Sequence, residues 1–275
     1  MSTVTASSAR EHRVTVRSLC RAKRKAEPIT MLTAYDFTFA RIFDAAGVDL
    51  LLVGDSLGNV VQGEATTLPV TLEESIYHTR LVARGATRAL VVADMPFGSY
   101  QVSPEEAVRN AIRFVKESAA QAVKLEGGSA MLRTSERIVA AGIPVMGHVG
   151  LTPQSVHTMG GLRVQGRGER GRSRVIEDAI AVQEAGAFAV VLEGIPSDLA
   201  KEITSTLSIP TIGIGAGVEC DGQVLVMHDL LGLSEWTPSF VKQYGSLGQS
   251  AAQAARAYID DVRHRKFPGE EHAYR

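Results

Sequence analysis

Apolar residues occur along the chain in short runs, separated by longer segments in which they repeat with the period of a helix. Short runs rich in β-branched residues are typical of buried strands, and a repeat every three to four residues is typical of helices. The predicted strands span residues 28–35, 49–53, 89–93, 122–125, 144–146, 188–192, 210–214 and 223–227. The predicted helices span 37–46, 135–141, 174–185 and 196–207, two that begin at Thr71 and Ser103, and a C-terminal stretch to about Arg265.

Two of these helices have recognisable start signals. Thr71 and Glu74 have the spacing of a capping box, in which each side chain accepts a hydrogen bond from the other residue's backbone N–H. Ser103 is followed by Pro104 and two glutamates, the order of an N-cap, a first-turn proline and acids near the positive helix end. Each signal places a helix between two predicted strands.

Strands that alternate with helices pair in parallel, with the helices packed outside the sheet. The runs are apolar throughout, as expected for strands that are buried on both faces. An open, doubly wound sheet has the same alternation. We favour a closed α/β barrel, the (β/α)₈ TIM barrel, because eight strands are counted and no dinucleotide fingerprint follows the first one. Gly213-x-Gly215-x-Gly217 is only a fragment of that fingerprint, and it follows strand seven.

The predicted organisation is a single-domain barrel preceded by an N-terminal helix. Residues 1–27 form the N-terminal extension and helix, residues 28–265 the catalytic barrel, and residues 266–275 a C-terminal tail. Residues 152–173 are the longest stretch without helix or strand period and follow strand five. Because this stretch contains several apolar residues that can pack, we expect a lid or a subunit contact there.

Composition narrows the class of protein. The chain has 275 residues, 45% of them hydrophobic, and a formal net charge of −1, so neither nucleic acid nor an anionic membrane is indicated as a partner. No apolar run approaches the roughly 18 residues of a membrane helix. Cys20 and Cys220 lack metal-ligand spacing and are expected to be reduced thiols of a cytoplasmic protein, although the N-terminal Ser and Arg residues leave a transit peptide open.

Acidic residues stand where three consecutive predicted strands end, at Asp55, Asp94 and Glu126. Each could cap the following helix. In a barrel, however, consecutive strand ends converge at the face that carries the chemistry. Three carboxylates in one small space repel one another unless a cation or protons neutralise them, and an all-oxygen ligand set suits Mg²⁺ better than zinc. A magnesium site is therefore our hypothesis.

Other polar residues accompany this cluster. Lys124 lies two residues before Glu126 and shares its barrel-facing side, where it either neutralises the acids or holds a substrate carboxylate or enolate oxygen. Ser56 either binds substrate or caps a turn. His148 is interpreted as a residue that orients a neighbour rather than a metal ligand. Glu193, on strand six across the barrel, is placed to act as a base.

Eight runs in order along residues 28–245 resemble the ketopantoate hydroxymethyltransferase family. They are LTAYD (32–36), VGDSLG (53–58), DMPFGSY (94–100), VKLEGG (123–128), GHVGLTPQSVHTMGG (147–161), VLEGIP (191–196), IPTIGIGAG (209–217) and GQVLVMHDLLGL (222–233). Any one run is weak evidence, but eight in order are specific. Residues 167–173 are richer in Arg and Gly than is typical of this family.

The resemblance implies a (β/α)₈ barrel that binds Mg²⁺ and assembles as a homo-oligomer, usually a decamer. It implies transfer of a hydroxymethyl group from 5,10-methylenetetrahydrofolate to 3-methyl-2-oxobutanoate through a magnesium-stabilised enolate, a step of pantothenate biosynthesis. The implied metal positions are Asp55, Asp94 and Glu126, and the implied ketoacid-binding positions are Asp55, Ser56, Asp94 and Lys124. Glu193 matches the family's proton acceptor.

Two other interpretations remain. One is a Mg²⁺-dependent carbon–carbon lyase or mutase of the phosphoenolpyruvate mutase and isocitrate lyase type, which uses no folate and often carries a catalytic cysteine in a mobile loop. Neither Cys20 nor Cys220 is placed for that role. The other is a barrel that binds a ligand without catalysis, and the retained acid cluster argues against it.

Overall fold

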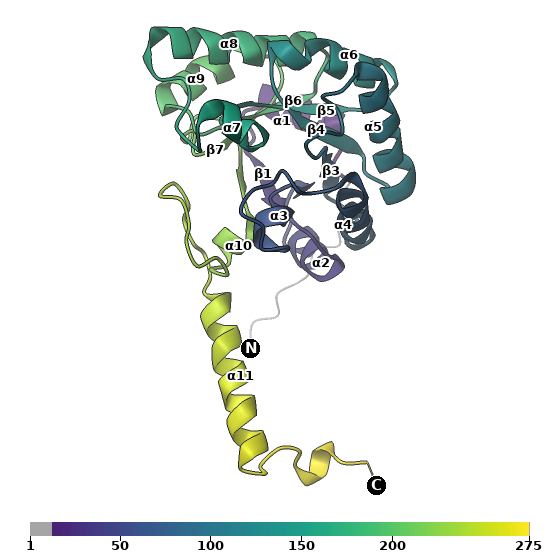
Figure 1. Cartoon of the computed structure of the whole chain (residues 1–275), viewed down its shortest axis with the longest axis vertical. Helices are drawn as coiled ribbons and strands as arrows, with labels where there is room; N and C mark the ends of the chain where they lie inside the picture. The colour runs from purple at the N-terminus through teal and green to yellow at the C-terminus, as the bar shows by residue number, and fades with distance from the viewer. Residues whose placement is uncertain (1–12, 275) are drawn as a thin grey trace. The chain divides into compact units, whose positions relative to one another are not determined.

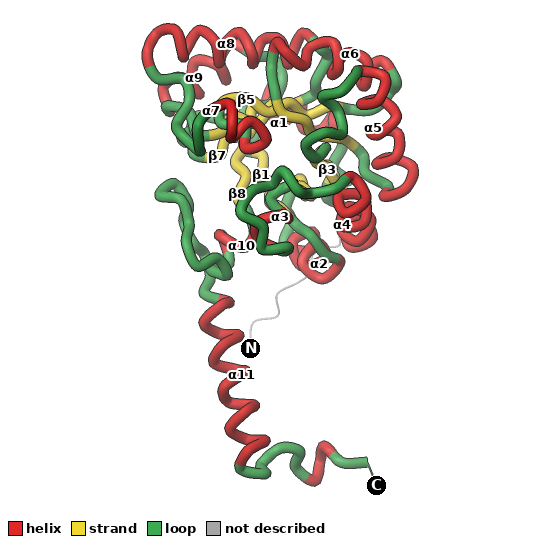
Figure 2. Tube along the Cα trace, viewed as in Figure 1, coloured by secondary structure: helices red, strands yellow, loops and turns green. Residues whose placement is uncertain are grey.

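The computed structural model describes residues 13–274. Eight strands pair in parallel and in chain order to close a barrel, with helices around it (Figures 1 and 2). The strands are β1 (Ile29–Thr33), β2 (Leu50–Val53), β3 (Leu90–Asp94), β4 (Ala122–Glu126), β5 (Val145–Gly150), β6 (Ala189–Glu193), β7 (Thr211–Ile214) and β8 (Gly222–Leu225). At the closure, the backbone N–H of Ile29 donates to the carbonyl of Asp221 at 2.9 Å. The predicted closed barrel is confirmed, and the open sheet is wrong.

Nine α-helices and two 3₁₀ turns precede β8 in the described part of the chain. They are α1 (Val16–Arg24), α2 (Phe37–Ala45), α3 (Leu57–Val60), α4 (Leu72–Gly85), α5 (Pro104–Ser118), η1 (Ser129–Met131), α6 (Leu132–Ala140), η2 (Pro153–Ser155), α7 (Val156–Met159), α8 (Gly168–Glu184) and α9 (Ser197–Thr206). The predicted capping box is present: the backbone N–H of Glu74 donates to Thr71 Oγ1 and that of Thr71 to the Glu74 carboxylate. Ser103 caps α5 as predicted.

Side chains alternate along each strand between the barrel interior and the helical shell. On β4, Ala122 belongs to the interior cluster, whereas Val123 and Leu125 pack with the helices. The strand residues of the interior cluster are Ile29, Met31, Leu50, Leu52, Leu90, Val92, Ala122, Met146, Ala189, Val191, Ile212 and Val224. The same inward-facing rows continue toward the carboxyl ends of the strands with polar residues. Lys124 and Glu126 therefore stand above Ala122 inside the barrel.

Helix α1 covers the opposite, N-terminal end of the barrel. Its Leu19 and the preceding Val14 belong to the interior cluster. The backbone N–H of Val14 donates to the carbonyl of Arg88, just before β3, at 2.8 Å, and Lys23 pairs with Asp221, just before β8, at 2.7 Å. The predicted N-terminal helix is thus confirmed, while residues 1–12 of the predicted extension lie outside the described residues.

The segment predicted to lack regular structure is partly helical. Residues 153–155 form η2, residues 156–159 form α7, and α8 begins at Gly168 rather than near Arg174. Glycines at 168 and 171 weaken the helical propensity of this stretch, which is why the pattern misses it. Arg172 offsets this loss, because its guanidinium pairs with Asp198 and Glu202 on α9.

The prediction of a continuous helical stretch from the end of β8 to about Arg265 is also wrong. Residues 231–246 are outside any helix, and they separate α10 (Met227–Leu230) from α11 (Leu247–Arg263). Gly232, Pro238 and Gly245 interrupt the helical pattern here, since glycine costs helix stability and proline removes a backbone donor. A 3₁₀ turn, η3 (Glu270–His272), follows α11.

By its internal contacts the chain divides into two compact units, Met1–Val224 and Leu225–Arg275. The first contains every strand except the last residue of β8, and the second contains α10, α11 and η3. The domain boundaries predicted at residues 28 and 265 remain a prediction.

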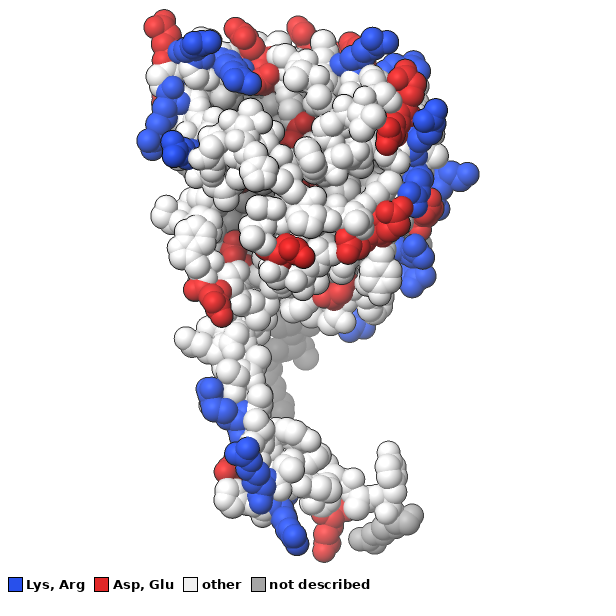
Figure 3. Space-filling view, viewed as in Figure 1, with Lys and Arg blue, Asp and Glu red and all other residues white. Residues whose placement is uncertain are grey.

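Charges on the first unit are interleaved rather than separated by sign. On the face that Figure 3 shows, blue and red side chains alternate over the outer helices at the right-hand rim. Arg113 on α5, for example, pairs with Glu73 on α4 and with Glu117 on its own helix. Between residues 13 and 274, the structure contains no helix both long and apolar enough to cross a membrane.

Candidate active site

The barrel brings the predicted site residues to one end, where strands β2 to β6 finish. Five of the seven residues continue the inward-facing rows of β3 to β6, and the other two follow the end of β2; five of the seven are almost completely buried. The seven are Asp55, Ser56, Asp94, Lys124, Glu126, His148 and Glu193. The register explains the grouping, because Asp94 lies beside Lys124 and Glu126 lies beside His148 on adjacent strands.

Lys124 and Asp94 form a buried ion pair. Lys124 Nζ donates to both carboxylate oxygens of Asp94, at 2.6 and 2.7 Å, and the two residues are 4% and 1% exposed. Burial raises the pKa of Asp94, and the ammonium of Lys124 opposes that rise. Burial lowers the pKa of Lys124, but the carboxylates of Asp94, Glu126 and Asp55 more than reverse this and raise it. Lys124 therefore stays cationic.

The carboxylates of Asp55 and Glu126 are linked by Gln154, which sequence reasoning did not single out. Gln154 Nε2 donates to Asp55 Oδ2 at 3.0 Å, and its backbone N–H donates to Glu126 Oε2 at 3.0 Å. Asp55 is also joined to Asp94, because its backbone N–H donates to Asp94 Oδ2 at 3.2 Å. The three acids are thus connected through hydrogen bonds, as the strand-end argument predicted that they would be neighbours.

His148 stands between two of the acids. Its Nδ1 is 3.4 Å from Glu126 Oε1 and its Nε2 is 3.1 Å from Glu193 Oε2, although neither ring nitrogen is well aligned for a hydrogen bond within the described structure. Burial and Lys124 lower the pKa of His148, but Glu126 and Glu193 outweigh them and raise it to about 9. The imidazolium thereby connects the cluster of acids to Glu193, whose side chain is 19% exposed.

Ser56 does not act as the turn cap that was one of its two interpretations. It is the N-cap residue of α3, yet its side chain makes no capping hydrogen bond in the described helix. Its hydroxyl instead lies 2.8 Å from the hydroxyl of Tyr35, which follows β1. Tyr35 was a second residue missed from the sequence, and it extends the polar site to the end of a sixth strand, β1.

The donor set of this site suits Mg²⁺. Over residues 13–274, no three or more His, Cys, Asp and Glu side chains are already spaced to hold a metal ion. The carboxylate oxygens described above accept hydrogen bonds from Lys124 and Gln154 instead. Mg²⁺ needs only one or two protein carboxylates, because water and substrate oxygens complete its octahedron. Four carboxylates beside one ammonium and one imidazolium also leave a negative balance that a cation would offset.

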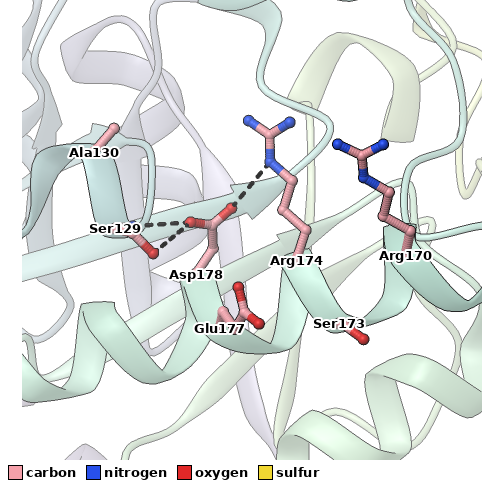
Figure 4. A pocket seen from close by; sticks show the side chains of 7 residues that line it. All are labelled: Ser129, Ala130, Arg170, Ser173, Arg174, Glu177 and Asp178. Carbon is pink, nitrogen blue, oxygen red and sulfur yellow. Dashed lines mark hydrogen bonds and ion pairs between the residues drawn. The ribbon is translucent and has the colours of Figure 1, made fainter.

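A cavity lies outside this cluster, between η1 and the first turns of α8. Its volume is about 500 Å³, and it is lined by Ser129, Ala130, Arg170, Ser173, Arg174, Glu177 and Asp178 (Figure 4). Asp178 accepts hydrogen bonds from the backbone N–H and the hydroxyl of Ser129. Two arginines face two acids here, so the lining is electrically balanced, and we interpret it as the seam that fixes α8 to the turn after Glu126.

Fold and site together define an enzyme of the (β/α)₈-barrel class, with a buried acid–base cluster at the carboxyl ends of its strands. Residues 13–270 match the model of the family described as ketopantoate hydroxymethyltransferase. The chain belongs to this family, so the resemblance and the transferase class predicted from the sequence are confirmed.

Curated relatives cover nearly the whole chain. The 3-methyl-2-oxobutanoate hydroxymethyltransferase of Pelobacter propionicus is 57% identical over 263 residues, which are 95% of this chain and 97% of that protein. The protein of the same name from Moorella thermoacetica is 55% identical over 268 residues, 97% of this chain and 100% of that protein. The prediction that the chain is an enzyme is confirmed.

Solved structures of other enzymes share the fold at low identity. A phosphonopyruvate hydrolase solved with oxalate and Mg²⁺ has a TM-score of 0.62 and 11% identity, and the match covers 94% of this chain and 93% of that one. A 2,3-dimethylmalate lyase of the PEP mutase/isocitrate lyase superfamily has a TM-score of 0.59 and 17% identity, with coverage of 92% and 89%. The lyase and mutase alternative thus has the same fold, whereas the sequence belongs to the hydroxymethyltransferase family.

Proposed function

We propose that this chain transfers a hydroxymethyl group from 5,10-methylenetetrahydrofolate to 3-methyl-2-oxobutanoate, giving 2-dehydropantoate and tetrahydrofolate, within pantothenate biosynthesis. The observation that carries the proposal is a continuous chain of contacts at the strand ends. It runs from Lys124 through Asp94, Asp55, Gln154, Glu126 and His148 to Glu193. One end of it is a fixed cation and the other is a partly exposed carboxylate, the two groups that deprotonation beside a carbonyl requires.

Glu193 is the proton acceptor in this proposal. Its carboxylate reaches solvent while its neighbours are buried, so it can approach a substrate lying over the cluster. His148 Nε2, 3.1 Å from Glu193 Oε2, orients this carboxylate. The proton on C3 of the ketoacid passes to Glu193, and the electron pair of the C–H bond moves into the enolate.

Lys124 is the electrostatic partner of that enolate. Its ammonium is held by Asp94, carries a charge in the neutral pH range and points along the inward-facing row of β4. A fixed cation in a site of low dielectric stabilises charge where it develops. Ser56, held against Tyr35, offers a hydroxyl to the ketoacid. Water adds to the methylene carbon of the folate as its two C–N bonds break, and tetrahydrofolate leaves with the two protons of that water. C3 forms a bond to the resulting carbonyl carbon, and the new alkoxide takes the proton that Glu193 holds.

Mg²⁺ is the cofactor in this proposal, with Asp55, Asp94 and Glu126 as the residues that hold it. When bound, the ion supplies Lewis-acid polarisation of the keto oxygen and the carboxylate of the substrate. The support is the oxygen donor set and the surplus of negative charge in the cluster.

Turnover tests the proposal directly. The protein is mixed with 3-methyl-2-oxobutanoate, methylenetetrahydrofolate and Mg²⁺, and 2-dehydropantoate is quantified by NMR, with each component omitted in turn. The proposal expects product only in the complete mixture. Cleavage of a carbon–carbon bond without folate points to the lyase alternative, and the absence of any turnover contradicts the proposal.

A homodecamer and a cytoplasmic location are also part of the proposal. The decamer rests on the family resemblance, and the location rests on the two cysteines that the sequence predicts to be reduced. We expect light scattering on the purified protein to give ten times the 29.4-kDa mass of one chain. A mass of one or two chains contradicts the decamer.

A further inference from the structure

Gln154 makes an unusually complete set of hydrogen bonds for a residue outside the strands. It lies in η2, on the segment that follows β5, and is 5% exposed. Its Nε2 donates to Asp55 Oδ2 and to the carbonyl of Met95, both at 3.0 Å. Its Oε1 accepts from the hydroxyl of Tyr100 at 2.7 Å. A carboxylate and a carbonyl can only accept, so the orientation of the amide is chemically determined.

The same residue also reaches the second acid. The backbone N–H of Gln154 donates to Glu126 Oε2 at 3.0 Å. Tyr100 completes the circuit, because its hydroxyl accepts from the backbone N–H of Glu126 at 3.1 Å while it donates to Gln154. Asp55, after the end of β2, and Glu126, at the end of β4, are therefore held by the amide and the backbone of one residue.

The segment that carries Gln154 is fastened at both ends beside Glu193. The backbone N–H of Leu151 donates to the carbonyl of Glu193 at 2.8 Å, and that of Gln165 donates to the carbonyl of Gly194 at 2.9 Å. Gln154, which lies between these two ends, attaches the segment directly to Asp55 and Glu126. A side chain that only filled space would need no such set of partners, and buried networks this fully satisfied fix a single arrangement of their members.

We infer that Gln154 is a positioning residue, which sets the orientation of the Asp55 and Glu126 carboxylates and ties the segment after β5 to them. The inference rests on the proposed function in assigning these two acids to Mg²⁺. Outer partners of metal-binding side chains typically change metal affinity about 10–100-fold when they are removed. Tyr100 acts one step further out, through the amide of Gln154.

The test compares Gln154→Met with Gln121→Met. Met has similar length and cannot donate to Asp55. Gln121 is a matched control, because its Oε1 also accepts a hydrogen bond, from the backbone N–H of Val91 at 2.9 Å. Gln121 lies just before β4, however, at the opposite end of the barrel from the acids. We expect calorimetry to give a Mg²⁺ affinity about 10–100-fold weaker for Gln154→Met and unchanged for Gln121→Met. Tyr100→Phe should weaken it by a smaller factor.

Hydrogen exchange of the metal-free protein gives a second measurement that does not depend on the reaction. Amides of residues 152–161 should exchange at least about tenfold faster in Gln154→Met than in the unchanged chain, and at the same rate in Gln121→Met. The exchange comparison needs no metal, so it tests the role of Gln154 even if the chain does not bind Mg²⁺. The Mg²⁺ affinity of the unchanged chain tests the proposed function separately.

The inference is wrong if Gln154→Met folds and binds Mg²⁺ as tightly as the unchanged chain or more tightly, because the amide would then merely compete with the ion. Equal exchange rates in residues 152–161 contradict the tie to the acids. Where the Met variant fails to fold, Gln154→Asn replaces it in both measurements. Its side chain keeps an amide but is one methylene shorter, so it falls short of Asp55 while the backbone bond to Glu126 remains.

Discussion

Lys124 Nζ lies 2.6 Å from Asp94 Oδ1 and 2.7 Å from Asp94 Oδ2, and both side chains are withdrawn from solvent. The two residues are register partners on adjacent strands, so the barrel fixes their separation. Two hydrogen bonds from one ammonium leave that cation at a defined place in a site otherwise dominated by acids. This pair gives the cluster a positive group without which its carboxylates would repel one another.

Lys124→Met should destabilise the fold because it leaves the Asp94 carboxylate buried without its partner. Removal of one member of a buried ion pair costs about 3–5 kcal/mol. Urea unfolding of the variant measures this cost. Lys201→Met is the control, because the pair between Lys201 and Glu219 is exposed and should contribute less than about 1 kcal/mol. Equal losses in the two variants would contradict the role of the buried pair.

Asp44 gives a prediction about pH. This residue of α2 accepts hydrogen bonds from the backbone N–H groups of Thr87, Arg88 and Ala89, just before β3. Burial raises the pKa of Asp44, but the hydrogen bonds from Ala89, Thr87 and Arg88 together outweigh it and lower the pKa below its ordinary 3.8. A depressed pKa means that the stabilisation is present above 3.8 and is lost as the pH falls through the folded-state value.

Asp44→Asn should therefore cost about 2–3 kcal/mol at neutral pH, because a neutral amide oxygen replaces an ionised acceptor. Denaturant unfolding at a series of pH values should show this difference constant above about pH 5 and shrinking below 3.8. Glu136→Gln, at an exposed position of α6, should leave the unfolding midpoint unchanged. A difference that grows as the pH falls would contradict the account.

Gly128 should not tolerate a side chain. A Cβ at this position would lie 2.2 Å from Asp178 Cβ and 2.4 Å from Asp178 Cα, so α8 would have to move away from the turn that follows Glu126. Gly128→Ala is expected to cost about 1–3 kcal/mol, measured by thermal unfolding. Gly171→Ala, on the same helix, places its Cβ no closer than 3.3 Å to another atom and should change stability by no more than about 1 kcal/mol.

Leu19 should matter for stability and not for metal binding. It is 4% exposed and belongs to the interior cluster at the N-terminal end of the barrel, far along the strands from the acids. Leu19→Ala is expected to cost about 2–5 kcal/mol by leaving a cavity, while the Mg²⁺ affinity of the folded protein stays the same. Leu162→Ala, at an exposed position, should change neither the stability nor the Mg²⁺ affinity. A large change in Mg²⁺ affinity on Leu19→Ala would contradict the separation of the two ends.

The strands and the inward position of Lys124 and Glu126 were predictable because both follow from local rules. Apolar runs mark strands that are buried on both faces, and alternation places every second residue on the same side. The convergence of Asp55, Asp94 and Glu126 followed from barrel topology alone. The start of α8 was missed because its glycines are compensated by Arg172, whose partners lie on another helix.

Gln154, Tyr100 and Tyr35 were missed for a related reason. Each was part of a run that carried the resemblance, but a glutamine or a tyrosine does not by itself indicate a functional site until its hydrogen-bond partners are known. The partners of Gln154 come from β2, β3 and β4, which are distant in sequence. Such a contact is a property of the folded barrel and not of any local pattern.

The most direct test of the account follows the C3 proton of 3-methyl-2-oxobutanoate by NMR in D₂O, with the protein and Mg²⁺ but without folate. The account predicts metal-dependent loss of this signal, slowed at least about 100-fold by Glu193→Gln while the ketoacid still binds. Glu177→Gln, in the cavity between η1 and α8, should leave the exchange unchanged. Exchange at the same rate in Glu193→Gln, or no exchange by the unchanged chain with Mg²⁺, would contradict the assignment of the strand-end cluster to ketoacid deprotonation.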